Sequence, residues 1–189
     1  MNKSSVFTAL FLCSAFFMSS CATQSIVVKP GYDFSAIKRV AVLNFNDAPY
    51  YPNSGAMPSE LFTKYMLKTG YSVIERTRID SIIQEHQLFL AGVLDPAQVK
   101  EFGKVAGVDA IITGSISMLT PERDFYEAGY QRFIAAQVGI TCRMISVETG
   151  EVLWVGSDTY DGMNTQTAFE YLISSLVDEL MKTLKKAHQ

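Results

Sequence analysis

Residues 134–154 read IAAQVGITCRMISVETGEVLW, two strands joined by a tight turn. From Ile134 to Met144 every second residue is apolar or small, which is the period of a β-strand with one buried face. Glu148-Thr149-Gly150 follows as the turn, where glycine supplies the positive φ that a tight hairpin often needs. Val152-Leu153-Trp154-Val155 is the expected partner strand. This stretch predicts a β-hairpin that packs one face on a core.

Buried strands and amphipathic helices alternate along the rest of the domain. Short apolar runs predict further strands at residues 40–45, 71–74 and 109–116. Apolar residues at helical spacing predict helices from Pro58 to Gly70, from Thr77 to Leu90, from Asp95 to Gly107 and from Thr167 to Leu184. Thr77, Asp95 and Thr167 are the expected N-caps. The fold class is therefore α/β: a single two-layer domain with a mixed β-sheet and helices packed on it.

The N-terminus has the layout of a bacterial lipoprotein signal. Lys3 gives a positive start, and the apolar run from Val6 to Met18 is shorter than the roughly 20 residues that a membrane-spanning helix needs. Met18-Ser19-Ser20-Cys21 then resembles a lipobox, with Met in place of the usual Leu. We expect Cys21 to be acylated, so that lipid is the membrane anchor of the mature chain.

This signal divides the chain into three parts. Residues 1–20 are the predicted signal peptide, residues 21–36 a lipidated tether, and residues 37–189 the α/β domain. Ala22 follows the cysteine at the position where the sorting rule of enteric lipoproteins places Asp for the inner membrane. By this resemblance the expected location is the outer membrane, facing the periplasm. Removal of the signal peptide leaves Cys21 and Cys142, and with Cys21 acylated, Cys142 has no partner for a disulfide in the mature chain.

Composition and motifs argue against several functions. A formal net charge of -3 disfavours nucleic-acid binding, which needs a basic face. We predict no catalytic residues, no cofactor and no metal site, because no ligand cluster, nucleophile motif or phosphate loop is present. His86 lies on an apolar helical stripe and His188 in the tail. Cys142 lies on the apolar face of its strand, where a thiol packs as a small hydrophobe.

Two segments mix aromatic and charged residues and are candidate interfaces. One is 119–132 and the other is 156–164. The residues singled out in them are Phe125, Tyr126, Tyr130, Tyr160 and Met163. Exposed aromatics among charges are common at protein interfaces. The alternative is that the tyrosines only cover the edges of the sheet.

Four stretches, in order, resemble the curli secretion lipoprotein (CsgG) family. They are 40–45, the segment from Val73 to Asp80, the segment from Gly107 to Ile116, and the hairpin from Met144 to Trp154. The resemblance implies a fold like the N-terminal domain of TolB and no enzymatic activity. Segments 119–132 and 156–164 lie where curli pore subunits carry long membrane-spanning hairpins, and both are shorter, which favours a periplasmic ring or adaptor.

The resemblance leaves two roles open. The first is an assembly component that forms a homo-oligomeric ring, with other envelope proteins, in a machine that exports or builds a surface polymer, as in Pel polysaccharide export. The second is a tethered activator of a peptidoglycan synthase, like the lipoprotein activators of penicillin-binding proteins. A tether from Ala22 to Ser35 spans about 50 Å at most, which disfavours reaching across the periplasm.

Overall fold

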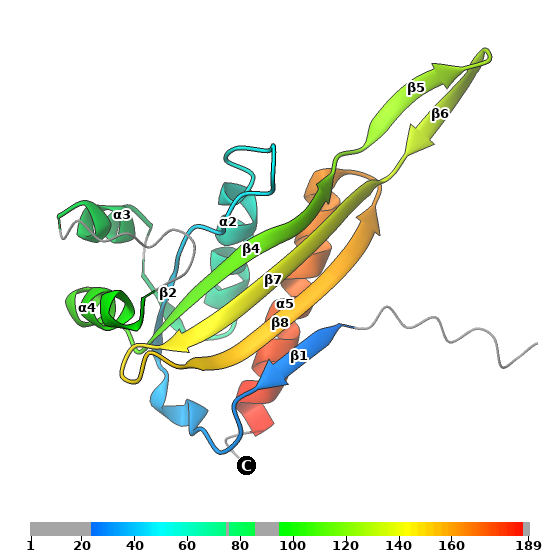
Figure 1. The fold of residues 1–189 in the computed structure, drawn as a ribbon. Helices are drawn as coiled ribbons and strands as arrows, with labels where there is room; N and C mark the ends of the chain where they lie inside the picture. The colour runs from blue at the N-terminus through cyan, green and yellow to red at the C-terminus, as the bar shows by residue number, and fades with distance from the viewer. Residues whose placement is uncertain (1–23, 75, 86–94, 187–189) are drawn as a thin grey trace, which may run out of the picture.

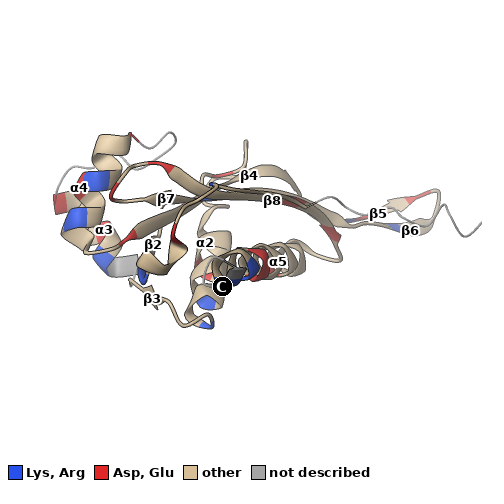
Figure 2. Ribbon diagram, turned by 90° about the horizontal axis from the view of Figure 1, so that it is seen from below, with Lys and Arg blue, Asp and Glu red and all other residues tan. Residues whose placement is uncertain are grey.

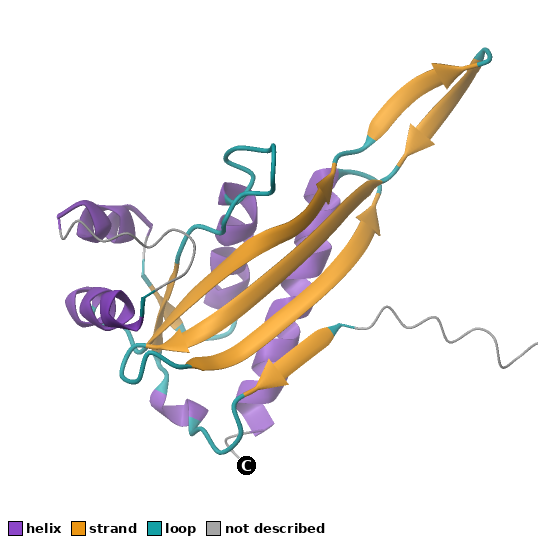
Figure 3. Ribbon diagram, in the orientation of Figure 1, coloured by secondary structure: helices purple, strands orange, loops and turns teal. Residues whose placement is uncertain are grey.

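The computed structural model describes residues 24–74, 76–85 and 95–186. They form one six-stranded mixed sheet, with helices on both faces, and a separate two-stranded hairpin (Figures 1 and 3). The strands of the main sheet run in the order β1-β8-β7-β4-β2-β3. Their bounds are β1 Ser25–Val28, β2 Arg39–Val42, β3 Ser72–Val73, β4 Ala110–Thr120, β7 Ala136–Ser146 and β8 Val152–Gly162. Strand β2 pairs in parallel with β3 and β4, and the other pairs are antiparallel. The α/β class with a mixed sheet is confirmed.

One face of the sheet is covered by two long helices. Helix α2 spans Ala56–Leu67 and α5 spans Thr165–Lys186. The apolar residues at every second position of β7, among them Val138 and Met144, are fully buried on this side, which confirms the face expected from the alternation. Leu172, Leu176 and Leu180 of α5 pack on it together with the buried Trp154 of β8. This core is the larger of the two.

The other face is covered at one end only. Helices α3, Arg76–Glu85, and α4, Pro96–Ala106, pack there on Ala41, Ile111 and Ile145. Their neighbours along the strands point to the first core, because successive side chains alternate across a sheet. A Cβ on Gly103 would lie 2.2 Å from Val147, so glycine permits the close contact between α4 and the turn region. The sheet and the helices α2 and α5 form the two expected layers, and α3 and α4 add a partial third layer on the other face.

Part of the segment predicted as a tether is folded into the domain. Within the predicted tether 21–36, β1 pairs with β8 from Ser25 to Val28, and Phe34–Ala36 form a 3-10 turn with Phe34 in the core. The Lys29 ammonium forms an ion pair with Glu151 in the β7–β8 turn. A run of three β-branched residues, Ile-Val-Val, suits an edge strand and accounts for this pairing.

Of the three predicted N-caps, one is confirmed and two are wrong, and α2 begins at Ala56, two residues before the predicted Pro58. Asp95 caps α4 by accepting a hydrogen bond from the Ala97 N–H at 3.0 Å, and Gly107 ends the helix with a φ of 65°. Helix α3 begins at Arg76, so Thr77 lies inside it. Helix α5 begins before Thr167, because the Asn164 side chain accepts from the Thr167 N–H at 2.8 Å and takes the cap position. Leu90 lies outside the described residues.

Candidate interaction surface

A second hairpin extends beyond the sheet. Strand β5, Arg123–Glu127, continues the direction of β4, and β6, Tyr130–Ile134, leads into β7. Figure 1 shows the hairpin reaching past the ends of α2 and α5, and Figure 2 shows it as a thin ribbon outside both helical layers. The turn residues Ala128 and Gly129 both have positive φ, 50° and 83°, as a two-residue hairpin turn with matching twist requires. The segment 119–132 is therefore part of a longer ribbon than the sequence indicated.

Every residue of the hairpin strands is exposed. Five of the ten are large and apolar, with exposed fractions of 40% for Phe125, 77% for Tyr126, 72% for Tyr130, 54% for Phe133 and 46% for Ile134. An apolar cluster of this kind on a protein surface marks a contact site. The hairpin is therefore the most prominent candidate interaction surface among the described residues.

The apolar residues are divided between both faces of the hairpin. In its register Phe125 lies opposite Arg132, and Tyr126 lies opposite Gln131. Because directly opposed residues share a face, Phe125, Tyr130 and Ile134 lie on one side, and Tyr126 and Phe133 on the other. The first side also carries an ion pair between Arg132 Nε and Glu127 Oε2 at 3.8 Å. Both sides of the hairpin therefore expose large apolar side chains to water.

The hairpin is fixed at its base. Glu122, between β4 and β5, accepts hydrogen bonds from the Thr165 N–H at 2.9 Å and the Thr165 hydroxyl at 2.7 Å. The hydrogen bond from the Thr165 side chain lowers the pKa of the Glu122 carboxyl. This contact joins the root of the hairpin to the start of α5. Beyond the root, the two strands pair only with each other, and an isolated two-stranded hairpin is marginal in water.

The structure separates the candidate interface residues into three places. Phe125, Tyr126 and Tyr130 lie together on the hairpin. Tyr160 of β8 instead stacks on Tyr171 of α5, with ring centroids 4.0 Å apart. Met163 follows β8 and is 77% exposed, next to the α5 cap. Segment 156–164 is thus mostly part of strand β8.

Phe133 and Ile134 were missed as surface residues. The alternation from Ile134 to Met144 predicted that Ile134 is buried, but β7 begins at Ala136, and Ile134 belongs to the exposed hairpin. The break lies at Ala135, between the two strands. The pattern of aromatic residues on both sides of Ala128-Gly129 was the available signal for a hairpin.

The residues considered for chemistry are unsuited to it or lie outside the described part. Cys142 is fully buried, and burial raises the pKa of its thiol. Cys21, His86 and His188 lie outside the described residues. Within 24–74, 76–85 and 95–186, no group of three His, Cys, Asp or Glu side chains is arranged to hold a metal ion. None of the described helices is long and apolar enough to cross a membrane.

The fold is similar to those of several solved structures. A PelC dodecamer from Paraburkholderia phytofirmans matches with a TM-score of 0.56 and 16% identity, covering 84% of this chain and 96% of that one. Lipoprotein GNA1162 from Neisseria meningitidis matches with a TM-score of 0.55 and 15% identity, covering 76% and 98%. The LpoB C-terminal domain from Escherichia coli matches with a TM-score of 0.50 and 13% identity, covering 70% and 87%. At these identities the likeness shows the fold.

The sequence itself decides the family. No curated protein matches the chain in sequence. The model of the family described as curli production assembly/transport component CsgG matches residues 26–168, which is most of the chain and includes every strand from β2 to β8. The chain therefore belongs to the CsgG family, as the four quoted stretches predicted.

Proposed function

We propose that this chain is a non-enzymatic lipoprotein of the outer membrane that assembles into a ring on the periplasmic side. The ring serves a machine that exports or builds a surface polymer. The hairpin β5–β6 is the observation that carries the proposal, because it exposes five large apolar residues on two faces and extends beyond the described helices. A neighbouring copy that covers one face or both removes this surface from water.

A projecting hairpin suits a head-to-tail contact between copies. A heterologous contact of this kind joins two different surfaces of the same chain, and it closes into a ring when the rotation between subunits allows. The similar PelC structure is described as a dodecamer, which supports the same kind of assembly for this chain. Acylation of Cys21 would confine the copies to a plane and raise their effective concentration.

The short tether supports a position close to the membrane. Strand β1 begins at Ser25, so only four peptide units separate it from Cys21, which is about 14 Å when extended. Strand β1 enters from the hairpin side of the sheet, because Ser25 lies opposite Ser157 and Val28 opposite Trp154, further from the hairpin. Ser157 is the middle residue of β8, so β1 starts about halfway along the sheet and runs away from the hairpin. With the lipid before β1, the hairpin would point toward the membrane in the assembled ring.

The second candidate is a tethered activator of a peptidoglycan synthase. The similarity to the LpoB C-terminal domain favours it. The three residues between Cys21 and β1 oppose it, because they cannot carry the domain far from the membrane. We therefore place assembly first.

The mass of the acylated, detergent-extracted protein by light scattering, with negative-stain images, tests this function. A closed ring of many subunits is the expected result. A single subunit at all concentrations used would remove assembly as the function and favour the activator.

A further inference from the structure

A cavity of about 230 Å³ lies on the sheet face opposite α5, beside the start of α4. Helices α3 and α4 cover this face only over Ile111 and Ile145, and the strands continue past them without a cover. The next residues on that face of β4, Thr113 and Ser115, are small. The cavity lies at the place where α4 stops covering the sheet. Its lining includes no residue of the hairpin.

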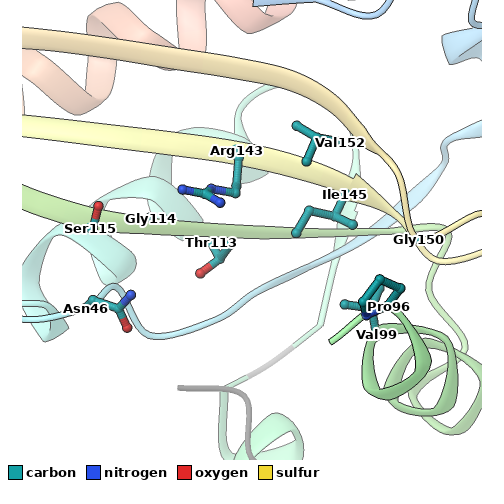
Figure 4. Close-up of a pocket in the computed structure, with 10 residues that line it drawn as sticks. All are labelled: Asn46, Pro96, Val99, Thr113, Gly114, Ser115, Arg143, Ile145, Gly150 and Val152. Carbon is teal, nitrogen blue, oxygen red and sulfur yellow. The ribbon is translucent and has the colours of Figure 1, made fainter. Parts of the chain in front are cut away.

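The cavity has one cationic side chain and several hydroxyl or amide groups. Arg143 of β7 lies directly opposite Thr113 of β4 in the register. Figure 4 shows the Arg143 guanidinium reaching along the floor toward Ser115, with Thr113 and Asn46 at the same end. The lining contains no Asp or Glu among the described residues. One end of the cavity therefore carries a positive charge and side chains that can donate hydrogen bonds.

Neither Arg143 nor Thr113 has a side-chain hydrogen bond or ion pair with another residue in the described part of the chain. Thr113 is only 8% exposed, so its hydroxyl is a nearly buried polar group that faces the cavity. Of the two acids in the adjacent turn, Glu151 is paired with Lys29, and Glu148 does not line the cavity. Arg143 itself is exposed, so its guanidinium meets water and is open to an anion that enters the cavity from outside the chain.

The opposite wall of the cavity is apolar. Pro96 and Val99 of α4 face Ile145 and Val152 of the two strands (Figure 4). A guanidinium binds a carboxylate through two parallel N–H donors, and hydroxyls and amides can bind the polar groups beside it. The volume is smaller than the roughly 300–1,000 Å³ of sites for drug-sized ligands. A small ligand fits this lining if it carries a carboxylate, polar groups on one side and apolar C–H groups on the other.

We propose that this cavity binds a carboxylate carried on a unit the size of one sugar ring or one amino acid, with Arg143 as the residue that pairs with the acid. Thr113 and Ser115 orient the ligand on the floor, and Val99 and Ile145 contact its apolar side. The carboxylate can belong to a sugar acid or to the end of a peptide, since both present the same group to Arg143.

Calorimetric titration of the full chain in detergent separates these sources. The probes are glucuronate with glucose as its neutral counterpart, and N-acetylalanine with its methylamide. We expect at least one acid to bind, and its neutral counterpart to bind at least about tenfold more weakly, because a charged hydrogen-bonded pair is lost. Binding of glucuronate alone identifies a sugar acid, and binding of N-acetylalanine alone identifies a peptide terminus.

Variants tie the binding to the cavity. Arg143→Gln should weaken the acid about tenfold or more, while Arg143→Lys keeps part of the affinity through its charge. Arg78→Gln, which changes another exposed arginine, on α3 and outside the cavity lining, is the matched control and should bind as the original chain does. No saturable heat with either acid, equal binding of acid and neutral counterpart, or full binding by Arg143→Gln each overturns the proposal. Circular dichroism checks that each variant is folded.

Discussion

Asp109 joins the start of β2 to the start of β4 through its side chain. Its Oδ2 accepts hydrogen bonds from the backbone N–H groups of Lys38 at 2.8 Å and Arg39 at 2.9 Å. Its own N–H donates to the Arg39 carbonyl at 2.9 Å, so the parallel pairing of these two strands begins at this residue. Asp109 belongs to the Gly107–Ile116 stretch that pointed to the family, and this is the structural role of the acid in it.

We predict that Asp109→Ala destabilises the fold by about 1–3 kcal/mol, because two backbone donors lose a charged acceptor. Asp109→Asn keeps one oxygen acceptor without the charge and should lose less. Urea unfolding of both variants measures the difference. Equal losses, or no loss from the alanine variant, would contradict the role assigned to the carboxylate.

Cys142 should be inert in the folded protein. Burial raises the pKa of its thiol, so the reactive thiolate is disfavoured, and no side of the residue is exposed to reagent. We predict that maleimide does not modify the peptide containing Cys142 at a pH of about 8 until denaturant unfolds the chain. Mass spectrometry of that peptide measures the modification. Rapid labelling of folded protein would show that the core around β7 opens.

At the scale of elements, the cap of α5 distinguishes the structure from the sequence pattern. Asn164 accepts from the Thr167 N–H, whereas the pattern had assigned the cap to Thr167. We predict that Asn164→Ala costs about 1 kcal/mol of stability and Thr167→Ala less than about 0.5 kcal/mol. Thermal or urea unfolding compares the pair. The reverse order of losses would restore Thr167 as the cap.

Elements with a strong period were predictable, and those defined by long-range pairing were not. The alternation of Val138, Ile140 and Cys142 identified the buried face of β7, and Asp95 with Gly107 marked both ends of α4. Strand β1 depends on pairing with β8, which is far away in the sequence, as the partners Val28 and Trp154 show. No local pattern separates such a short edge strand from a tether.

The candidate surface was predicted in part. Phe125, Tyr126 and Tyr130 were identified from their mixture with charges, and they lie together on the hairpin. Tyr160 was grouped with them, but its ring stacks on Tyr171 because β8 continues well beyond the apolar run that revealed it. The cavity at Arg143 was not predicted, because its lining comes together from three strands, α4 and the loop that holds Asn46.

The hairpin should be dispensable for folding. Its residues belong to neither core, and its root is tied to the domain at Glu122. We predict that a short glycine-rich turn in place of residues 123–134 changes the free energy of unfolding by less than about 1 kcal/mol. Urea unfolding measures this. A large loss would mean that the hairpin supports the fold and is not a dedicated contact surface.

At the scale of the whole molecule, β1 starts about halfway along the sheet and runs away from the hairpin, and Cys21, on which we expect the lipid, comes shortly before β1 in the chain. Lipid anchorage limits the orientations in which two copies meet, and the hairpin offers each copy an apolar surface to bind. These features together account for a planar, closed assembly better than any one of them alone.

The central claim is that the hairpin holds the copies together, and the mass of a hairpin variant tests it most directly. In Tyr126→Ser/Phe133→Ser two aromatic rings are removed from one face, each of which can contribute about 2 kcal/mol as an interface anchor. The affinity between copies should then fall by about 10³-fold. Tyr50→Ser is the matched control, since Tyr50 is 99% exposed on a loop outside the hairpin. By light scattering in detergent, we expect a ring for the original chain and for Tyr50→Ser, and single subunits for the double variant. A double variant that remains a ring of the same mass would contradict the account.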